Sequence, residues 1–500
     1  MATPTAYQTV AVIGAGTMGI GIAEVAAQHG HQVLLYDLNQ DQLQQALMHM
    51  QKRLNKRVER GKISAEQVDK CMAAIQAVQN LEDLEPADLV IEAIIEDLAI
   101  KQKLFAQLES ICSEQTVLAS NTSSISITAI AGSLQKPERF IGIHFFNPAP
   151  VMKLVEVISG RRSAVVVMDS ILELCQSWGK VAVAAKSTPG FIVNRVARPF
   201  YGEPLKLYQE GLAEFPVIDT VLQKAAGFRM GPFTLMDLIG VDINFAVSQT
   251  VYAAMFNDPR YRPSLIQSEM VAAGLLGRKS GAGFYTYGET PQAQVDVSET
   301  SVDVKKLRIT INPDSQHFSW LKDTAQDHAD ILLTEDTSIA GLRLGDCEVR
   351  ISDGRTANTI ARKLNEEVAL LDFSFDYNTA THVHVCFSDA VKSTTKNEII
   401  ALFQSLNKAV IIGADQPGMI AMRTVAMLIN EAADAVFNGV CSEADVDQAM
   451  RYGVNYPAGL LATGEQLGWQ HVATVLKRLQ KWFGDDRYRL SPWIRNQYDG

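Results

Sequence analysis

The sequence predicts an α/β protein in four consecutive parts: a doubly wound parallel sheet, an all-α domain, a mixed α/β middle segment and a second all-α repeat. Three observations support this prediction. Strand-like and helix-like runs alternate up to residue 187, helical periodicity dominates 188–288, and a late segment repeats an earlier one. The repeat pairs TPGFIVNR at 188–195 with QPGMIAMR at 416–423, 228 positions later.

The first part of the chain consists of strand–helix–strand units. A β-branched run, QTVAVIGAG, ends in glycines, and the helical run after it, GTMGIGIAEVAAQHG, ends at Gly30. A second buried strand, HQVLLYDL, ends in Asp37. The remaining elements expected here are a charged helical hairpin at 40–80, strands at 87–94 and 116–124, and a helix at 101–112. Such units form a parallel sheet with helices on both faces.

The rest of the chain contains two helical copies separated by a linker and a mixed segment. The echo between the copies continues at Glu203 and Glu431, Gly211 and Gly439, Asp219 and Asp447, and then matches Gly231-Pro232 with Tyr456-Pro457 after a small shift. Residues 286–300 are polar, as is typical of a linker, and 301–412 resemble a worn copy of a sheet domain. We therefore expect domains at 1–187, 188–288, 289–412 and 413–500.

The composition argues against several classes of protein. A net charge of −11 disfavours nucleic-acid binding, which needs a basic surface. Six cysteines without a C-x-x-C pair predict reduced thiols in a cytoplasmic protein. The opening MATPTAYQTV lacks the features of a secretory signal, and no apolar run is long enough to span a membrane, so we expect no membrane association.

The glycine turn Gly14-Ala15-Gly16-Thr17-Met18-Gly19 follows a strand, opens a helix and precedes a strand that ends in an acid. In this context G-x-G-x-x-G binds a dinucleotide. Gly14 permits the tight turn, Gly16 lets the pyrophosphate approach the helix N-terminus, and Gly19 lets the helix pack on the sheet. Asp37 would bind the adenosine ribose and repel a 2′-phosphate, so we expect a Rossmann-type domain that binds NAD over NADP. The alternative is a structural turn without a ligand.

A histidine and a glutamate interrupt two apolar runs. His144 lies in FIGIHFF, and Glu156 lies twelve positions later in KLVEV, beyond a loop with two prolines. A strand–turn–strand arrangement can bring the two side chains together. A carboxylate bonded to one imidazole nitrogen leaves the other free as a base, which is what oxidation of an alcohol needs. The alternative is a core histidine bonded to a backbone carbonyl, with Glu156 solvated.

Together these motifs resemble the NAD-dependent L-3-hydroxyacyl-CoA dehydrogenases. The shared motifs cover 8–285 and are, in chain order, VAVIGAGTMGIGIAE, LVIEAIIED, SNTSS, HFFNPAPVMKLVEV, TPGFIVNRV, GPFTLMDLIG and GRKSGAGFY. The length and the second helical domain resemble the bacterial 3-hydroxyadipyl-CoA dehydrogenases of phenylacetate breakdown, with the 3-hydroxybutyryl-CoA dehydrogenases as the nearest sibling group. The resemblance implies oxidation of the 3-hydroxyl of an acyl-CoA substrate by NAD⁺.

The resemblance also implies roles for four residues around the reacting carbon. His144 is the general base and Glu156 its partner. Ser123 and Asn194 would hydrogen-bond the reacting oxygen. From the residues alone, Ser123 could instead cap the next helix, and Asn194 could be a helix-start residue.

Further residues are matched to the cofactor and to CoA. Glu96 and Lys101 correspond to positions that contact the nicotinamide half of NAD, although Glu96 and Asp97 could be first-turn acids of a helix. The helical hairpin at 40–62 corresponds to an arm that closes over CoA. Its basic residues Lys52, Arg53 and Lys56 could meet the CoA phosphates or form an ordinary solvated face.

The second helical copy is expected to be non-catalytic. It has Met422 where the first copy has Asn194, and the sequence shows no counterpart of the His144–Glu156 pair ahead of it. Family members usually dimerise through this domain type, so we expect the duplicate to pack against the first copy. Formation of homo-oligomers through the helical domains is a second expectation that the sequence allows. His382, His384 and Cys386 share one face of a strand, which favours an ordinary strand over a metal site.

Two other functions compete with an acyl-CoA dehydrogenase. One is a non-catalytic NAD-binding protein on the same scaffold, and the other is a dehydrogenase of hydroxy acids that carry no CoA. If the substrate is dicarboxylic, its distal carboxylate would need a cation. Five basic residues lie in the relevant domain, and the sequence does not choose among Arg195, Arg198, Lys206, Arg229 and Lys279.

Overall fold

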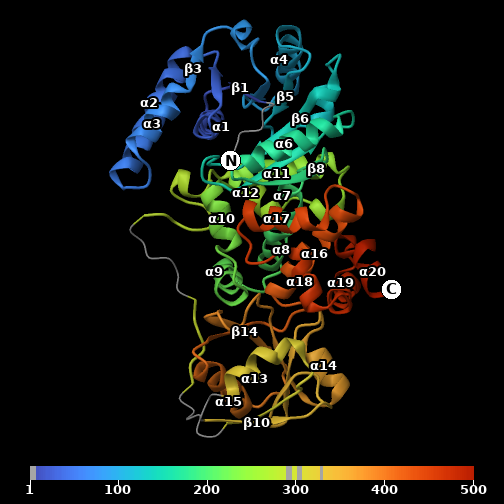
Figure 1. The fold of residues 1–500 in the computed structure, drawn as a ribbon. Helices are drawn as coiled ribbons and strands as arrows, with labels where there is room; N and C mark the ends of the chain where they lie inside the picture. The colour runs from blue at the N-terminus through green and yellow to red at the C-terminus, as the bar shows by residue number, and fades with distance from the viewer. Residues whose placement is uncertain (1–6, 289–294, 301–306, 327–329, 500) are drawn as a thin grey trace. The chain divides into compact units, whose positions relative to one another are not determined.

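The computed structural model describes residues 7–288, 295–300, 307–326 and 330–499 (Figure 1). Two expectations from the sequence, the absence of a signal at the start of the chain and the linker at 286–300, therefore fall partly outside the described residues. By its contacts the chain forms two compact units. The first unit contains Met1–Arg195 and Asn438–Val454, and the second contains Val196–Phe437 and Asn455–Gly500.

An eight-stranded sheet, in the order β3-β2-β1-β4-β5-β6-β7-β8, forms the centre of the first unit. Strands β1 to β6 run parallel, whereas β7 is antiparallel to β6 and β8 is parallel to β7. The strands are β1 (Thr9–Ile13), β2 (Gln32–Tyr36), β3 (Ile75–Val78), β4 (Leu89–Glu92), β5 (Val117–Ser120), β6 (Phe140–Phe145), β7 (Leu154–Ser159) and β8 (Val181–Lys186). The predicted parallel sheet is thus confirmed.

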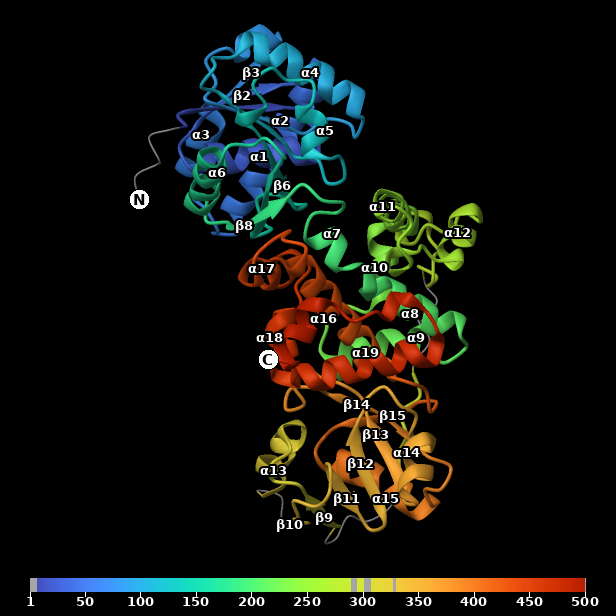
Figure 2. The same ribbon diagram turned by 90° about the vertical axis from the view of Figure 1, so that its right-hand side faces the viewer.

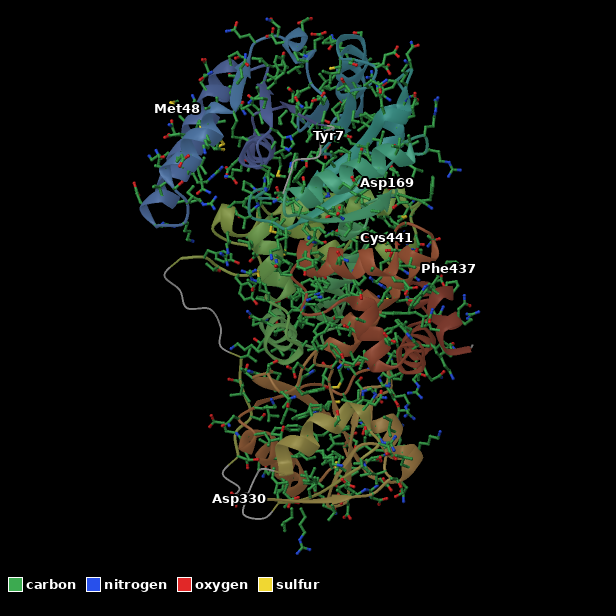
Figure 3. The ribbon with its side chains drawn as sticks, in the orientation of Figure 1. Tyr7, Met48, Asp169, Asp330, Phe437 and Cys441 are labelled. Atoms are coloured by element: carbon green, nitrogen blue, oxygen red, sulfur yellow. The ribbon has the colours of Figure 1, made fainter. Side chains whose placement is uncertain are left out.

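The helices of the first unit include those that the sequence predicts after the glycine turn, at 40–80 and at 101–112. They are α1 (Thr17–Gln28), α2 (Gln40–Glu59), α3 (Ala65–Ala73), η1 (Leu81–Leu84), α4 (Leu98–Ile111), α5 (Ile127–Ala131), η2 (Pro137–Arg139), α6 (Val165–Ser177) and α17 (Glu443–Gly453). The hairpin of α2 and α3 begins with Asn39 as N-cap, and Ser64 forms a capping box with Gln67. Its outer face is exposed, and even the apolar Met48 is 61% exposed (Figure 3).

A segment from late in the chain covers the last strand of this sheet. The Lys186 N–H of β8 donates to the Val440 carbonyl at 2.8 Å, and α17 packs on β7 and β8. An edge strand left open would present unpaired backbone groups to other chains. The second helical copy therefore contributes one helix to the protection of the first sheet.

The second unit combines two helical copies with a smaller sheet. The first copy contains α8 (Arg198–Gln209), α9 (Phe215–Thr220), η3 (Val221–Ala226), α10 (Pro232–Ile239), α11 (Val241–Ala254), η4 (Pro259–Tyr261), α12 (Leu265–Ala272) and η5 (Arg278–Ser280), and α7 (Val193–Val196) connects it to the first unit. The second copy contains α16 (Ala421–Phe437), α18 (Leu460–Leu467), α19 (Trp469–Phe483), η7 (Asp486–Tyr488) and α20 (Pro492–Asp499).

The smaller sheet has seven strands in the order β10-β9-β11-β12-β13-β14-β15. Its elements are β9 (Leu307–Ile311), η6 (Gln316–Phe318), α13 (Ser319–Gln326), β10 (Ile331–Glu335), β11 (Leu342–Leu344), β12 (Cys347–Ile351), α14 (Ala357–Leu364), β13 (Glu367–Leu371), β14 (His382–Phe387), α15 (Ser393–Ser405) and β15 (Ala409–Ile412). Its last four strands run in the same relative directions as β5 to β8. The mixed α/β middle segment that the sequence predicts is thus confirmed, and its origin as a worn copy of a sheet domain stays a prediction.

The two helical copies pack against each other through α8 and α16, as expected (Figure 2). Glu203 of α8 accepts hydrogen bonds from Arg423 Nε and from Tyr488 Oη, each at 2.9 Å. Its counterpart Glu431 accepts from Tyr261 Oη at 2.6 Å and from Arg260 Nη1 at 3.3 Å. Each copy thus supplies an arginine and a tyrosine to the buried glutamate of the other.

The repeat has one constant register from β7 to α18, and the shift expected near Gly231 is wrong. Strands β7 and β14, like helices α6 and α15, have bounds that differ by 228 positions. Gly231 is the N-cap of α10, and Gly459, also 228 positions later, is the N-cap of α18. Asn455, with φ of 55°, takes the left-handed position that Gly227 takes in the first copy. Backbone conformation, rather than the shared proline, sets this register.

Candidate functional site

The register of β6 and β7 places His144 and Glu156 opposite each other. His144 Nδ1 lies 2.7 Å from Glu156 Oε2. A carboxylate only accepts hydrogen bonds, so Nδ1 carries the proton and Nε2 keeps its free lone pair. His144 is 6% exposed, and its ring lies 4.5 Å from that of Phe146 and 6.0 Å from that of Phe191, between ring centroids. The pair can therefore act as a base with an orienting acid in an apolar setting.

Glu156 also holds the backbone that leads to Asn194. Its Oε1 accepts from the Ile192 N–H at 3.0 Å and from the Val193 N–H at 2.9 Å, and the residue has no exposed surface. These N–H groups lie at the start of α7 and lack partners in the preceding turn. One carboxylate therefore orients the imidazole and anchors the residue next to Asn194.

A hollow of about 350 Å³ collects most of the predicted catalytic residues. It lies where β4, β5 and β6 end, at the carboxyl edge of the sheet, which is where doubly wound sheets bind ligands. The predicted residues in its wall are Met18, Glu96, Lys101, Ser123, His144 and Asn194. Glu156 is not part of the wall because it lies behind His144. Asn121, which also lines the hollow, accepts the Phe145 N–H at 2.8 Å and so ties the end of β5 to β6.

Lys101 is a buried cation with two carboxylate neighbours, Glu92 and Glu96. It is 1% exposed, and its Nζ lies 2.5 Å from Glu92 Oε1 and 3.4 Å from Glu96 Oε2. Glu92, at the end of β4, also accepts from Ser120 Oγ at 2.6 Å. Glu92 and Ser120 were not predicted. An acid that ends an otherwise apolar strand, as in LVIEA, was the signal that could have identified Glu92.

The helix caps bear on the local alternatives for Ser123 and Glu96, whereas Asn194 is a helix-start residue that also lines the hollow. The N-cap of α5 is Ser126, so Ser123 does not cap that helix. Instead the Ser123 N–H and Oγ both donate to Glu96 Oε1, at 2.9 and 3.3 Å. Asp97 is the N-cap of α4, whereas Glu96 lies outside that helix and faces the hollow. Asn194 is the second residue of α7, and its position in the helix does not keep it from the hollow.

A second hollow of about 780 Å³ lies along the glycine turn, and the residues present fit an adenosine. Gly14 and Gly16 line it together with Asp37 and the exposed apolar Leu38 and Ile95. Gly14 has a φ of +100°, and a Cβ there would lie 2.6 Å from the Ala93 carbonyl oxygen. A Cβ on Gly16 would meet nothing within 4 Å, so this backbone is open to a ligand.

Gly19 and Asp37 have contacts that the sequence did not predict. A Cβ on Gly19 would lie 1.8 Å from the Gly14 carbonyl oxygen, so this glycine closes the turn on itself more than on the sheet. Asp37 Oδ2 accepts the Ala15 N–H at 2.7 Å, and Oδ1 accepts the Asn39 N–H at 2.8 Å. Asp37 thus orders the glycine turn while remaining in the wall of the hollow. Thr17 lies in the first turn of α1 and lines neither hollow.

The three basic residues of α2 differ in their surroundings. Arg53 forms an ion pair with Glu24, a residue of α1 that is 1% exposed, and is therefore engaged in neutralising a buried charge. Lys52 and Lys56 are exposed on the same helix. None of the three lines either hollow. The role of Lys52 and Lys56 toward CoA stays a prediction, and Arg53 is the least available of the three.

A second histidine–carboxylate pair exists in the smaller sheet, which corrects the expectation that the second copy has no counterpart. His384 Nδ1 lies 2.7 Å from Asp372 Oδ2. Adding 228 to 144 and 156 leads to these two positions, but the acid and the histidine have exchanged places. Asp372 also accepts the N–H groups of Ile420 and Ala421, at 3.1 and 2.8 Å. These are the counterparts of Ile192 and Val193, so the carboxylate anchors the helix in both copies.

The reversed pair has no opening toward a ligand. His384 is 2% exposed, and its Nε2 has no partner in the described part of the chain. A Cβ on Gly413 would lie 2.1 Å from this nitrogen, so the ring faces the neighbouring strand β15. No hollow that the structure describes includes it. Within the described ranges no three metal-binding side chains gather, at 382–386 or elsewhere.

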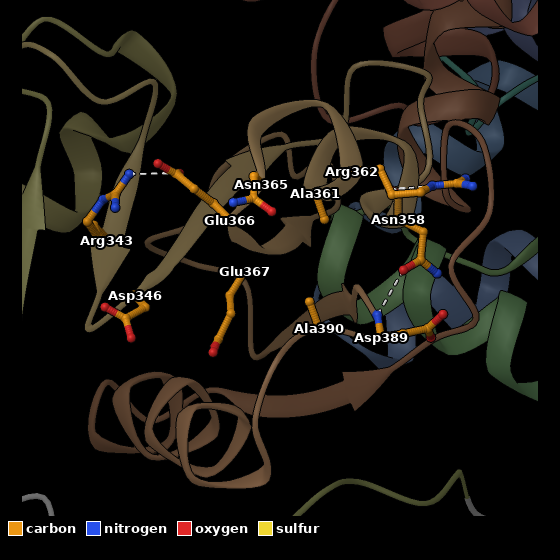
Figure 4. A pocket seen from close by; sticks show the side chains of 10 residues that line it. All are labelled: Arg343, Asp346, Asn358, Ala361, Arg362, Asn365, Glu366, Glu367, Asp389 and Ala390. Carbon is orange, nitrogen blue, oxygen red and sulfur yellow. Dashed lines mark hydrogen bonds and ion pairs between the residues drawn. The ribbon is translucent and has the colours of Figure 1, made fainter.

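A hollow of about 830 Å³ in the smaller sheet lies at the wrong edge for a nucleotide (Figure 4). Its wall includes Glu367 and lies near the amino ends of β12 and β13. Its charged groups pair with neighbours: Arg343 with Glu366 at 3.0 Å, and Glu367 with Lys392 at 3.2 Å. At the opposite, carboxyl edge His471 of α19 donates to the Ser352 carbonyl, and a smaller hollow of about 270 Å³ has Ile351 and Phe373 in its wall.

The comparisons with known proteins place these features in one family. The model of the 3-hydroxyacyl-CoA dehydrogenase NAD-binding domain matches residues 9–188, and the model of the C-terminal domain matches both 190–287 and 418–499. A model of the 3-hydroxybutyryl-CoA dehydrogenase reduced Rossmann-fold domain matches 349–417. No helix among the residues that the structure describes is long and apolar enough to cross a membrane.

Three relatives show how far the similarity extends. The chain is 46% identical to a 3-hydroxyadipyl-CoA dehydrogenase of Escherichia coli (strain K12), over 98% of this chain and 97% of the other. It is 42% identical to a 3-hydroxybutyryl-CoA dehydrogenase of Clostridioides difficile, over 56% of this chain and 99% of the other. A crystal structure of 3-hydroxybutyryl-CoA dehydrogenase from Escherichia coli K12 superimposes with a TM-score of 0.89 at 45% identity, covering 98% of both chains.

Proposed function

The chain belongs to the 3-hydroxyacyl-CoA dehydrogenase family, and from this premise we propose that His144 removes the hydroxyl proton of its substrate. The enzyme oxidises the 3-hydroxyl of an (S)-3-hydroxyacyl-CoA to a ketone, with NAD as its cofactor. When bound, NAD⁺ supplies the acceptor for the hydride that leaves C3. The observation that supports the role of His144 is its bond to Glu156, which leaves Nε2 free as a base.

The neighbouring residues have positioning and electrostatic roles in this proposal. Glu156 stabilises the imidazolium that forms when the proton arrives on Nε2. Ser123 and Asn194 hydrogen-bond the 3-oxygen and so orient C3. Gly14, Gly16 and the start of α1 bind the pyrophosphate, with Thr17, Met18 and Gly19 in the same turn, and Asp37 binds the ribose. Glu96 and Lys101 contact the nicotinamide half, and Glu92 keeps Lys101 in place.

Replacing His144 by Ala tests this mechanism. The variant should bind NAD⁺ as the wild type does, because His144 lies outside the hollow along the glycine turn. Its turnover should fall by about 10²–10⁴, the usual contribution of a positioned base. NADH formation measures the turnover, and titration of NADH fluorescence measures the binding. Near-normal turnover would rule out His144 as the base.

We propose 3-hydroxyadipyl-CoA as the substrate, by analogy with the relative of that name, which is 46% identical over 98% of this chain. The second candidate is 3-hydroxybutyryl-CoA, which the crystal structure with a TM-score of 0.89 favours through its title. A comparison of kcat/KM for the two substrates with the purified enzyme separates the candidates. A higher value for 3-hydroxybutyryl-CoA would exclude the first.

The domain boundaries, the cellular location and the self-association of the protein are also proposals. We propose that residues 1–187, 188–288, 289–412 and 413–500 act as domains, of which the last is non-catalytic because Met422 replaces Asn194 and the reversed pair is closed. A cytoplasmic location is supported by the six cysteines, none of which forms a disulfide. Self-association through the helical domains is a further proposal, and light scattering of the full chain measures it.

A further inference from the structure

The hollow of about 270 Å³ at the carboxyl edge of the smaller sheet has its whole wall in the second unit. The wall includes Ile351, the last residue of β12, and Phe373 and Ser374, just beyond the end of β13. Since β12 and β13 run parallel, their carboxyl ends meet at this edge, where open α/β sheets bind ligands. In the repeat, Phe373 lies 228 positions after Phe145, which lines the hollow of about 350 Å³ at the first sheet. The two hollows therefore occupy equivalent places in the two sheets.

Two buried polar groups in this wall lack a hydrogen-bond partner among the described residues. They are the indole Nε1 of Trp320 and the hydroxyl Oγ of Ser374. Trp320 is 8% exposed and Ser374 is 7% exposed. Buried polar groups are nearly always paired, because an unpaired one costs its desolvation free energy. An indole N–H only donates and a hydroxyl both donates and accepts, so a ligand with an acceptor and a further polar group would satisfy both.

Aromatic rings make up much of the same wall. The Trp320 ring stacks on the Tyr377 ring, with 5.0 Å between the centroids and 15° between the planes. Phe373 and Phe375 also line the hollow, and Phe375 is only half-buried. Aromatic side chains bind flat heteroaromatic molecules such as nucleobases, because each ring offers a π-face for stacking. The wall therefore combines flat apolar surfaces with unused hydrogen-bonding groups.

The wall of the hollow carries little charge. Among its described residues there is no lysine or arginine, and its one carboxylate, Asp376, is exposed. Burial and the neighbouring His471 lower the pKa of His317 to about 4, so this imidazole is uncharged near neutral pH. The ammonium of Lys408 lies 5.5 Å from the centre of the Trp320 ring, but it donates to two backbone carbonyls and lies outside the wall. A phosphate or carboxylate would find no counter-charge in this wall, which favours an uncharged ligand.

An adjoining hollow of about 610 Å³ shares Gln316, Ser319 and Gln466 with the hollow of about 270 Å³. These exposed amide and hydroxyl side chains can donate and accept hydrogen bonds, as the hydroxyl groups of a sugar require. Asp314 and Glu465 also line the adjoining hollow, whose described wall has no basic side chain. The smaller hollow lies just below the range of about 300–1,000 Å³ typical of small-molecule sites. It therefore suits the flat part of a ligand whose polar part lies in the adjoining hollow.

We propose that the two adjoining hollows bind an uncharged nucleoside, with its base among the aromatic rings and its ribose at the shared polar rim. A ring nitrogen or carbonyl of the base accepts from Trp320 Nε1. The Ser374 hydroxyl pairs with a further polar group of the base. This assignment gives the middle segment a ligand-binding role that the closed pair of Asp372 and His384 does not supply.

Titration calorimetry of the full chain in saturating NADH, which occupies the hollow along the glycine turn, tests the proposal with adenosine, guanosine, cytidine and uridine. We expect at least one nucleoside to bind. Trp320→Phe, which keeps an aromatic ring and removes the N–H, and Ser374→Ala should each weaken that binding by about 5-fold to 100-fold, the usual effect of an unmade hydrogen bond. Trp482→Phe, which changes a tryptophan that is 59% exposed and lies outside the hollow, is the matched control and should bind as the wild type does.

Each outcome decides the proposal. If no nucleoside binds with a Kd of about 1 mM or tighter, the hollow holds only water and the proposal falls. Binding that neither Trp320→Phe nor Ser374→Ala weakens would lie elsewhere on the protein and would also overturn it. The 5′-monophosphate of the bound nucleoside should bind more weakly than the nucleoside, and equal or tighter binding would contradict an uncharged ligand. Should Trp320→Phe fail to fold, Ser374→Ala decides, because it removes only a hydroxyl.

Discussion

Replacing Glu156 by Gln should separate the two functions of this carboxylate. Oε1 accepts the Ile192 and Val193 N–H groups, and Oε2 accepts from His144 Nδ1. The amide oxygen of Gln can keep the two backbone bonds, which directs its NH₂ group toward Nδ1. Because NH₂ only donates, Nδ1 must become the acceptor and the proton moves to Nε2. The imidazole then has no free lone pair on the side of the hollow.

The expected magnitudes follow from these contacts. Loss of the base should lower kcat by about 10²–10⁴, or about 3–5 kcal/mol of barrier height. The free energy of unfolding should change little, because both backbone N–H groups keep their acceptor. Glu156→Ala, in contrast, leaves two buried N–H groups without a partner, at about 1–3 kcal/mol each. The pair of variants thus distinguishes lost chemistry from lost stability.

The assay combines NADH formation at saturating substrate with urea denaturation of the same preparations. Glu66→Gln, which removes one member of the exposed Glu66–Lys70 ion pair, is the control for a lost carboxylate charge and should behave as the wild type. A folded Glu156→Gln enzyme with near-normal kcat would refute the reasoning, because the orientation of His144 by Glu156 would then be dispensable.

Two further predictions concern the cofactor and the packing of the two helical copies. Asp37→Ala should raise the ratio of kcat/KM for NADP⁺ over NAD⁺, because the carboxylate that repels a 2′-phosphate is removed. It should also weaken NAD⁺ binding, since Asp37 orders the glycine turn through the Ala15 N–H. An unchanged ratio would exclude the ribose role. Glu203→Gln should destabilise the protein by about 3–5 kcal/mol near neutral pH, because it leaves the buried guanidinium of Arg423 without its full counter-charge. Burial raises the pKa of Glu203, but Arg487, Arg423 and the Tyr488 hydroxyl outweigh it, so the folded-state pKa is lowered. The stabilisation is therefore present above the ordinary glutamate pKa of about 4.3 and is lost as pH falls through the lower folded value. Urea denaturation at several pH values should show the difference between wild type and variant shrinking in acid, and a difference independent of pH would contradict the linkage.

Local patterns made several parts of the site predictable. The glycine turn and Asp37 lie within one strand–helix–strand unit, so their relation follows from the geometry of that unit. His144 and Glu156 are joined by a short antiparallel turn, and their spacing of twelve residues makes them direct cross-strand neighbours. The second copy was equally visible as a repeat. Its pair at Asp372 and His384 is hidden in the sequence, because the acid stands at the position that matches His144 and the histidine at the position that matches Glu156.

By itself, the sequence determined the strand–helix–strand fold class of the first unit, the cofactor class and the candidate base, because these depend on patterns that span a few tens of residues. Only the tertiary structure decided which partners the buried charges have. It placed Glu92 and Glu96 beside Lys101, engaged Arg53 with Glu24, and left Arg198 without an acid among the described residues. The physical reason is that a buried charge loses its hydration, so a partner of opposite charge or a hydrogen bond must offset the desolvation free energy. Which side chains share an interior depends on contacts between distant segments, and no local pattern encodes them.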